Sequence, residues 1–275
     1  MIQTGTISSQ DGTSIFFREA LVPNCTQAVV LVHGFAEHSG RYEHVMAALN
    51  DASISVMAID LRGHGRSGGV QGHMESVDQY VEDIHTAVTV LKEKSQRSKI
   101  ILMAHSMGGM VASHYAVTHP KELAGLVMSS PLMGIKVHIP TWKWVVGEVM
   151  ANIKPFFQLK STIDANDLTH DKAIVALYQK DDLNFHFVKA KWFSQIQTAI
   201  AEAQGFASRI QTPLLLQLSD PDRIVDAEKS REWFQKCQMP DRKQLVYSGF
   251  FHEIYNELER EKPIRDAIQW ITTRK

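Results

Sequence analysis

The 275-residue chain has few of the features that mark specialised protein classes. Its two cysteines, Cys25 and Cys237, have no paired spacing, so we expect free thiols in a reducing compartment. Sixteen glycines and nine prolines are too few for a collagen-like or low-complexity chain. No apolar run approaches the ~20 residues that span a bilayer. The N-terminus also has no secretory signal pattern, and we expect a cytoplasmic protein, at most peripheral to a membrane.

The charge is balanced, with 29 basic and 30 acidic side chains. A nucleic-acid-binding protein normally has a basic stripe, so we expect no nucleic-acid partner. Hydrophobic residues make up 44% of the chain, a content typical of a soluble globular protein. Length alone allows either one large domain or two small ones.

Short apolar runs alternate with helical patterns along most of the chain. Residues 6–20 alternate around Asp11-Gly12, which predicts a β-hairpin. The apolar runs suit strands that are buried on both faces of a parallel sheet; they are residues 28–32, 55–59, 100–104, 123–129, 214–218 and 244–247. The spacing of apolar residues predicts a helix over 77–91, and further helices are expected at 107–118, 227–236 and 263–273. This alternation predicts an α/β fold with helices on both sheet faces.

Residues 131–208 break this alternation. The segment is mostly helical in pattern and holds 10 of the 23 aromatic residues. We interpret it as an insertion between the sixth and seventh strands, with additional core helices as the alternative.

Two segments resemble the nucleophile elbow G-x-S-x-G. Residues 65–69 match it letter for letter, whereas 104–108 have Ala104 in place of the first glycine. An elbow needs a strand before the serine and a helix after it. Ser106 has both, while Ser67 lies among glycines that do not sustain a helix. We therefore predict that Ser106 is the nucleophile and that Ser67 is a loop residue.

A serine nucleophile needs a base, and the base needs an orienting acid. In α/β-hydrolases the order along the chain is serine, acid, histidine. His252 is the only histidine beyond the strand at 214–218, so it is the predicted base. Asp222 is the preferred acid; Asp220 and Asp226 are the alternatives, with Asp226 better suited to an N-cap. The backbone N–H groups of Phe35 and Met107 are the predicted oxyanion donors.

Five segments together carry a family resemblance over almost the whole chain. They are His33–Tyr42, Asp60–Ser67, Ala104–Gly109, Asp222–Asp226 and His252–Glu257. In these segments the chain resembles the monoacylglycerol lipase and lysophospholipase branch of the α/β-hydrolases. It departs from the family pattern at Ala104, at the acid loop 218–222 and at Asp182.

The resemblance implies an α/β-hydrolase fold, with a mostly parallel eight-stranded sheet, helices on both faces and a helical cap. Residues 1–130 and 209–275 would form the core, and 131–208 the cap. The family assigns Ser106, Asp222 and His252 to the catalytic triad, and Phe35 and Met107 to the oxyanion hole. The implied reaction releases a fatty acid from a monoacylglycerol or lysophospholipid through an acyl-enzyme, without a metal or organic cofactor.

The cap is the expected place for contact with a lipid-like substrate, and we name Trp142, Trp144, Phe156 and Phe157 as its candidate residues. Aromatic and lysine side chains in this segment also suggest a membrane-facing surface. A short-chain carboxylesterase, thioesterase or aminopeptidase of the same superfamily is an alternative, as is a non-catalytic binding protein. The head group, the acyl-chain length and the oligomeric state stay open.

Overall fold

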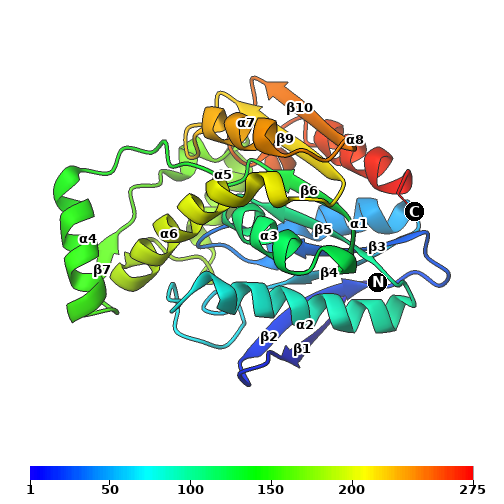
Figure 1. Cartoon of the computed structure of the whole chain (residues 1–275), viewed down its shortest axis with the longest axis horizontal. Coiled ribbons are helices and arrows are strands. Elements are labelled where there is room, and N and C mark those ends of the chain that lie inside the picture. Colours follow the sequence, from blue (N-terminus) through cyan, green and yellow to red (C-terminus); the bar gives the residue numbers. More distant parts are fainter. Residues whose placement is uncertain (275) are drawn as a thin grey trace.

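A twisted eight-stranded sheet forms the centre of the computed structural model, which describes residues 1–274 (Figure 1). Its strand order is β1-β2-β4-β3-β5-β6-β9-β10, and all neighbours from β4 to β10 are parallel. The strands are β1 (Gln3–Ser8), β2 (Ser14–Ala20), β3 (Gln27–Val32), β4 (Ile54–Ile59), β5 (Ile100–His105), β6 (Leu123–Ser129), β9 (Leu214–Asp220) and β10 (Arg242–Ser248). The predicted α/β fold and mostly parallel eight-stranded sheet are confirmed.

The strands begin and end close to the apolar runs that predicted them. The hairpin of β1 and β2 is antiparallel, and Gly12 takes the positive φ of 83° that its turn requires. Inside the parallel sheet, alternate residues of β3 face opposite layers: Val30 and Val32 join one hydrophobic cluster, and Val29 and Leu31 the other. Both faces of the sheet are therefore covered, which explains the unbroken apolar runs.

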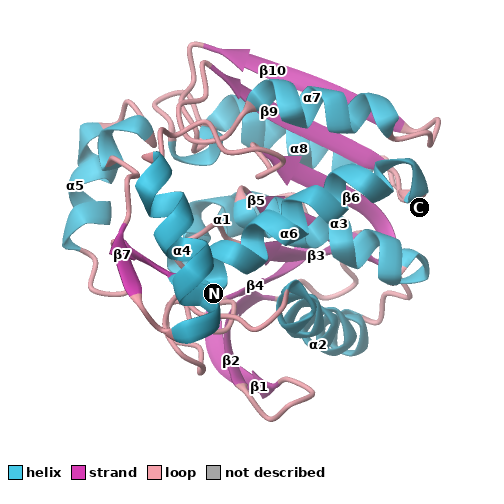
Figure 2. Ribbon diagram, turned by 60° about the vertical axis from the view of Figure 1, so that its left-hand side comes forward, coloured by secondary structure: helices cyan, strands magenta, loops and turns pink. Residues whose placement is uncertain are grey.

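Helices form a layer on each face of the sheet (Figure 2). Side chains of α1 (Glu43–Asp51) and α8 (Glu261–Thr272) enter the hydrophobic cluster on one face. Those of α2 (Val77–Ser95), α3 (Met107–Thr118) and α7 (Ala227–Lys236) enter the cluster on the other. The four predicted helices are present, and α1 is a further helix that was not predicted from the sequence. Short 3₁₀ turns lie at Ser39–Tyr42, Pro120–Glu122, Ala165–Asp167, Ala207–Arg209 and Ile254–Asn256.

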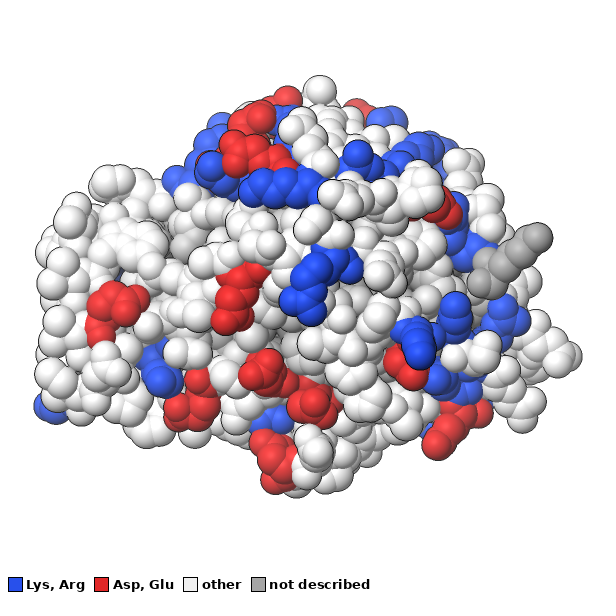
Figure 3. Space-filling view, viewed as in Figure 1, with Lys and Arg blue, Asp and Glu red and all other residues white. Residues whose placement is uncertain are grey.

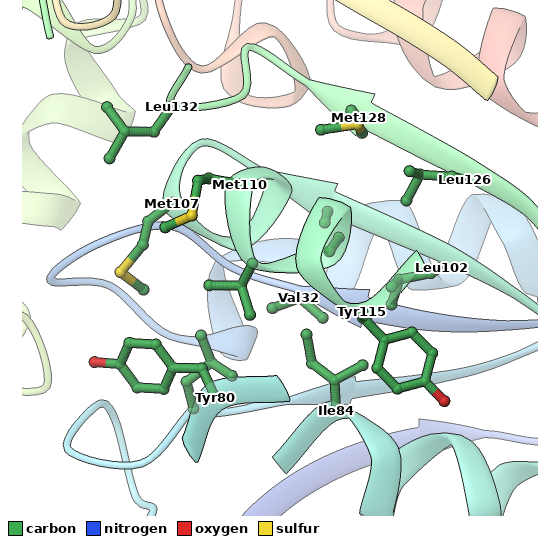
Figure 4. Packing of buried hydrophobic residues seen from close by; sticks show 14 of the residues in the cluster. Val32, Tyr80, Ile84, Leu102, Met107, Met110, Tyr115, Leu126, Met128 and Leu132 are labelled. Carbon is green, nitrogen blue, oxygen red and sulfur yellow. The ribbon is translucent and has the colours of Figure 1, made fainter. Parts of the chain in front are cut away.

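The packing around α3 places the start of this helix firmly against the sheet. Met107 and Met110 are fully buried and lie close to Tyr80 of α2 and Leu132 of the loop after β6 (Figure 4). Unbranched methionines fill irregular gaps well. The residue that precedes α3 is Ser106, so this packing fixes the position of the predicted nucleophile.

The chain between β6 and β9 contains α4 (Thr141–Ile153), β7 (Gln158–Lys160), α5 (Lys172–Lys180), β8 (Phe187–Lys189) and α6 (Ala190–Phe206). The antiparallel β7–β8 pair was not predicted, because strands of three residues leave no periodic pattern. Helix α6 rests on the core, where His114 Nε2 of α3 lies 2.9 Å from the carbonyl oxygen of Ala199. Within residues 1–274, no helix is both long and apolar enough to cross a membrane.

Candidate active site

Ser106 lies in a sharp turn between β5 and α3. Its φ of 51° and ψ of −118° are unusual for a residue with a side chain. Two backbone hydrogen bonds hold the turn: Ser106 N–H donates to the carbonyl of Ser129 at 2.9 Å, and Leu132 N–H donates to the carbonyl of Ser106 at 2.9 Å. The strained residue is thus fixed by its neighbours, as a nucleophile elbow requires.

Small residues around this turn let backbone segments approach closely. A Cβ atom at Gly108 would lie 2.4 Å from the carbonyl oxygen of His33, and one at Gly109 would lie 2.9 Å from Pro131 Cβ. The alanine at position 104, in contrast, sits inside β5 with its backbone paired to β3 and β6. Its methyl group is accommodated, so the missing glycine does not disturb the turn.

Ser67, the other candidate nucleophile, forms hydrogen bonds that hold a loop. Its hydroxyl accepts a hydrogen bond from Phe16 N–H at 2.8 Å and donates one to the carbonyl of Asp60. It therefore ties its loop to β2. Its place in a loop agrees with the prediction from the sequence.

His252 reaches Ser106 from the loop after β10. Its Nε2 lies 2.9 Å from Ser106 Oγ, and its Nδ1 lies 2.8 Å from Asp222 Oδ2. The histidine is 3% exposed and Asp222 is 1% exposed. The structure thus brings together three predicted residues that lie 116 and 30 positions apart (Ser106 to Asp222, and Asp222 to His252).

Asp222 is fixed by its own hydrogen bonds. Its Oδ1 accepts from the N–H groups of Ile224 and Val225 at 2.8 and 2.9 Å, and its Oδ2 accepts from Ser219 Oγ at 2.8 Å. Burial would raise the pKa of Asp222, but His252 and these backbone donors outweigh it and lower the pKa to about 2. The carboxylate is therefore ionised at neutral pH.

The two alternative acids lie elsewhere. Asp220 ends β9 and is exposed. Asp226 caps α7, where its side chain accepts hydrogen bonds from the N–H groups of Glu228 and Lys229. The predicted N-cap is confirmed at Asp226.

Burial would lower the pKa of His252, but the charge of Asp222 and the hydrogen bond to it raise the pKa above the usual value of 6.5. Glu253 and Glu37 act in the same direction. The imidazolium that forms when His252 takes a proton is thereby stabilised.

The predicted oxyanion donors lie beside Ser106. Met107 is the first residue of α3, so its N–H is among the helix N–H groups without an intrahelical acceptor. Phe35 follows β3 and lines the same space as Ser106. A side-chain oxygen of Glu37 accepts the N–H of Gly34 at 2.6 Å, which fixes the His33–Gly34 peptide, one residue before Phe35. Two backbone donors on fixed segments can stabilise the negative charge of a tetrahedral intermediate.

An apolar cavity with a volume of about 100 Å³ extends from Ser106 beneath the segment between β6 and β9. Its walls come from the loop after β6, from β7 and β8, and from α6; they include Leu132, Ile135, Val137, Ile139, Leu159, Val188, Trp192, Phe193 and Ile196. The sequence reading did not name these residues. The sequence pattern that could have identified them is the alternation of apolar residues at 135, 137 and 139 and the helical spacing of apolar residues at 192, 193 and 196.

A second, smaller space of about 30 Å³ also opens at Ser106. Polar side chains line it, among them Glu37, His105, Tyr178 and Glu253. Burial and the proximity of His252 lower the pKa of His105 to about 4, so this ring is neutral at pH 7. The site therefore has one apolar and one polar side.

The four aromatic residues predicted to contact substrate do not line either space. Trp142, Phe156 and Phe157 are 59%, 53% and 37% exposed. Trp144 is half-buried, with its ring 4.9 Å from that of Phe193. The walls come mainly from α6, the loop after β6 and the β7–β8 pair, and α4 contributes Lys143 but none of its aromatic residues. The aromatic content of the first part of the insertion was therefore a misleading guide.

Comparisons with known proteins agree with this geometry. The family model described as serine aminopeptidase, S33, matches residues 23–259. A monoacylglycerol lipase of Mycolicibacterium smegmatis is 30% identical over 89% of this chain and 88% of its own length. The crystal structure of Paleococcus ferrophilus monoacylglycerol lipase superposes with a TM-score of 0.87 at 30% identity, covering 94% of this chain and 98% of that one.

The chain belongs to the monoacylglycerol lipase branch of the α/β-hydrolases, and it is a serine hydrolase. The relatives in this branch differ in their named substrates: a protein of Bacillus subtilis that is 25% identical over 87% of this chain and 92% of its own length is named phospholipase YtpA. Among residues 1–274, no group of three or more His, Cys, Asp or Glu side chains is arranged to hold a metal ion.

Proposed function

We propose that this hydrolase cleaves the ester of a monoacylglycerol and releases a fatty acid. The observation that carries the proposal is the position of Ser106, between a deep apolar cavity and a small polar space. We assign the acyl chain to the first and the uncharged polyol head group to the side of the second. The proposed catalytic residues are Ser106, His252 and Asp222, with the N–H groups of Phe35 and Met107 as oxyanion donors.

The reaction follows from the hydrogen-bonded chain of the triad. His252 Nε2 accepts the proton of Ser106 Oγ as this oxygen bonds to the ester carbonyl carbon. The imidazolium then gives the proton to the departing glycerol oxygen, and an acyl-enzyme remains. His252 takes a proton from a water molecule that attacks the acyl-enzyme, and returns this proton to Ser106 Oγ as the fatty acid leaves. Asp222 holds the imidazole through Nδ1 and does not take the proton.

The polar space also bears on the choice of head group. Two carboxylates, Glu37 and Glu253, face it, and one guanidinium, Arg41, pairs with both. The net charge of this group is −1, which disfavours a phosphate next to the scissile ester. This argument favours monoacylglycerols over lysophospholipids.

A matched substrate panel tests the proposal. We expect the highest kcat/KM for a monoacylglycerol, with lower values for the lysophosphatidylcholine of the same acyl chain, for p-nitrophenyl butyrate and for amino-acid p-nitroanilides. A preference for the lysophospholipid would show that lysophospholipids, and not monoacylglycerols, are the main substrates. A preference for the anilides would indicate an aminopeptidase.

We also propose that residues 131–208 form a lid that contacts a membrane surface. Exposed apolar side chains form one stripe along α4: Trp142, Val145, Val149 and Ile153, which are between 48% and 67% exposed. Residues 131–160 hold four lysines and one glutamate. In the view of Figure 3 the end of the molecule that carries α4 is largely uncharged. An apolar stripe with flanking lysines suits an anionic lipid interface.

Vesicle sedimentation tests the lid surface. We expect binding to vesicles that contain an anionic lipid, and weaker binding after Trp142→Ser and Val145→Ser. Trp144→Ser is a less suitable variant, because Trp144 packs against Phe193 and its loss would disturb the lid itself. Equal sedimentation of wild type and double variant would contradict the proposal.

A further inference from the structure

Arg41 joins two loops that the proposed mechanism needs at a fixed distance. It follows β3 in the chain, and its side chain is 9% exposed. Its guanidinium donates to both carboxylate oxygens of Glu253 at 2.6 Å and to Glu37 Oε2 at 2.6 Å. The Tyr178 ring of α5 covers the guanidinium, with Cζ 4.8 Å from the ring centroid. This planar, bidentate arrangement is one that arginine makes and lysine does not.

Each of the two carboxylates lies next to a segment that carries a proposed catalytic group. Glu37 Oε1 accepts the N–H of Gly34 at 2.6 Å, one residue before the oxyanion donor Phe35. It also accepts the hydroxyl of Tyr42 at 2.7 Å. Glu253 follows the base His252 in the chain.

Glu37 stays ionised beside the Arg41 guanidinium. Burial would raise the pKa of Glu37, but Arg41 and nearby groups lower it to about 2. Since a buried ion pair is costly unless its hydrogen bonds are complete, loss of the guanidinium leaves two uncompensated carboxylates. The loops they belong to would then be free to shift.

We propose that Arg41 is a positioning residue that sets the distance between the oxyanion donor Phe35 and the base His252. The inference rests on the proposed esterase mechanism. It predicts that Arg41 acts mainly on the chemical step, because it lines neither the acyl cavity nor the polar space and reaches the latter only through Glu37 and Glu253. A displacement of about 1 Å at a reacting group typically costs on the order of 10²-fold in rate.

The charges around His252 give a second, independent readout. The groups that face it are Asp222, Glu253, Glu37 and the neutral ring of His105. Glu253→Gln removes one negative charge and keeps the shape of the side chain. The acidic limb of the kcat/KM profile therefore moves to lower pH in this variant. A role of the ion pair in the stability of the fold alone would leave kcat per labelled site at the wild-type value.

The experiment compares Arg41→Met, Arg41→Lys, Glu253→Gln and Arg62→Met. Arg62 is the matched control, because it is also buried and paired with Asp83 at 2.6 Å, but its side-chain partners include no residue of the triad. Rates are measured with p-nitrophenyl butyrate and with a monoacylglycerol, and are divided by the number of sites that a fluorophosphonate labels. The first substrate needs only the triad and the oxyanion donors, so it tests Arg41 even if monoacylglycerols are not cleaved.

We expect Arg41→Met to lower kcat on the order of 10²-fold with KM changed only a few-fold, and Arg41→Lys to recover part of the loss. Arg62→Met should keep the wild-type kcat per labelled site. An Arg41→Met enzyme with wild-type kcat per site would overturn the inference. So would a wild-type kcat per labelled site in Glu253→Gln, a conservative variant that breaks the bidentate pair and covers the case in which Arg41→Met does not fold.

Discussion

At the scale of single residues, the backbone of Ser106 is strained and its hydroxyl is in contact with His252. We predict that Ser106→Ala lowers kcat on the order of 10⁶-fold and leaves the fold intact. Ser67→Ala is the matched control. It removes two hydrogen bonds and lowers the free energy of unfolding by about 1–3 kcal/mol, but it should not change kcat. Hydrolysis rates and urea unfolding of both variants check the prediction.

The pH dependence also follows from one residue. The pKa of His252 lies above 6.5, and the protonated ring is unable to accept the proton of Ser106. We therefore expect kcat/KM to rise tenfold per pH unit at acidic pH and to level off at a midpoint above 6.5. Asp222→Asn should move the midpoint to lower pH and lower kcat on the order of 10⁴-fold. A wild-type midpoint below 6.5 would contradict the role given to Asp222.

At the scale of elements, the short strand β8 forms part of the acyl cavity through Val188. Val188 is half-buried, so a larger side chain there enters the cavity without disturbing the core. We predict that Val188→Trp lowers kcat/KM for a sixteen-carbon acyl chain at least tenfold relative to a four-carbon chain. The ratio of the two values, measured with p-nitrophenyl esters, isolates the cavity from the chemistry. An unchanged ratio would show that the chain lies elsewhere.

The elements also show where sequence reasoning succeeds. The hairpin at Asp11-Gly12 and the N-cap at Asp226 were predictable, because each depends on neighbours within a few residues. His252 was predictable from chain order. The pairing of Arg41 with Glu253 was not, because the two residues are 212 positions apart and have no shared periodicity. The aromatic run near Trp142 suggested the wrong cavity wall, since composition does not say which side of a helix is covered.

At the scale of the whole molecule, the segment between β6 and β9 is bound to the core at several points. Trp233 of α7 is fully buried and donates from Nε1 to the carbonyl of Ala203 in α6 at 3.0 Å. His114 of α3 bonds the same helix at Ala199. These contacts make α6 part of the main hydrophobic cluster. The proposed lid and core should therefore unfold together, although only the lid is inserted.

Calorimetry of wild type and Trp233→Ala tests this coupling. The substitution leaves a cavity and an unpaired carbonyl, so we expect the free energy of unfolding to fall by about 3–5 kcal/mol. The transition should stay single, with equal calorimetric and van't Hoff enthalpies in both proteins. Two resolved transitions in the wild type would instead show that the lid melts separately. In that case α6, which carries the cavity-wall residues Trp192 and Phe193, would unfold with the lid and separately from the core.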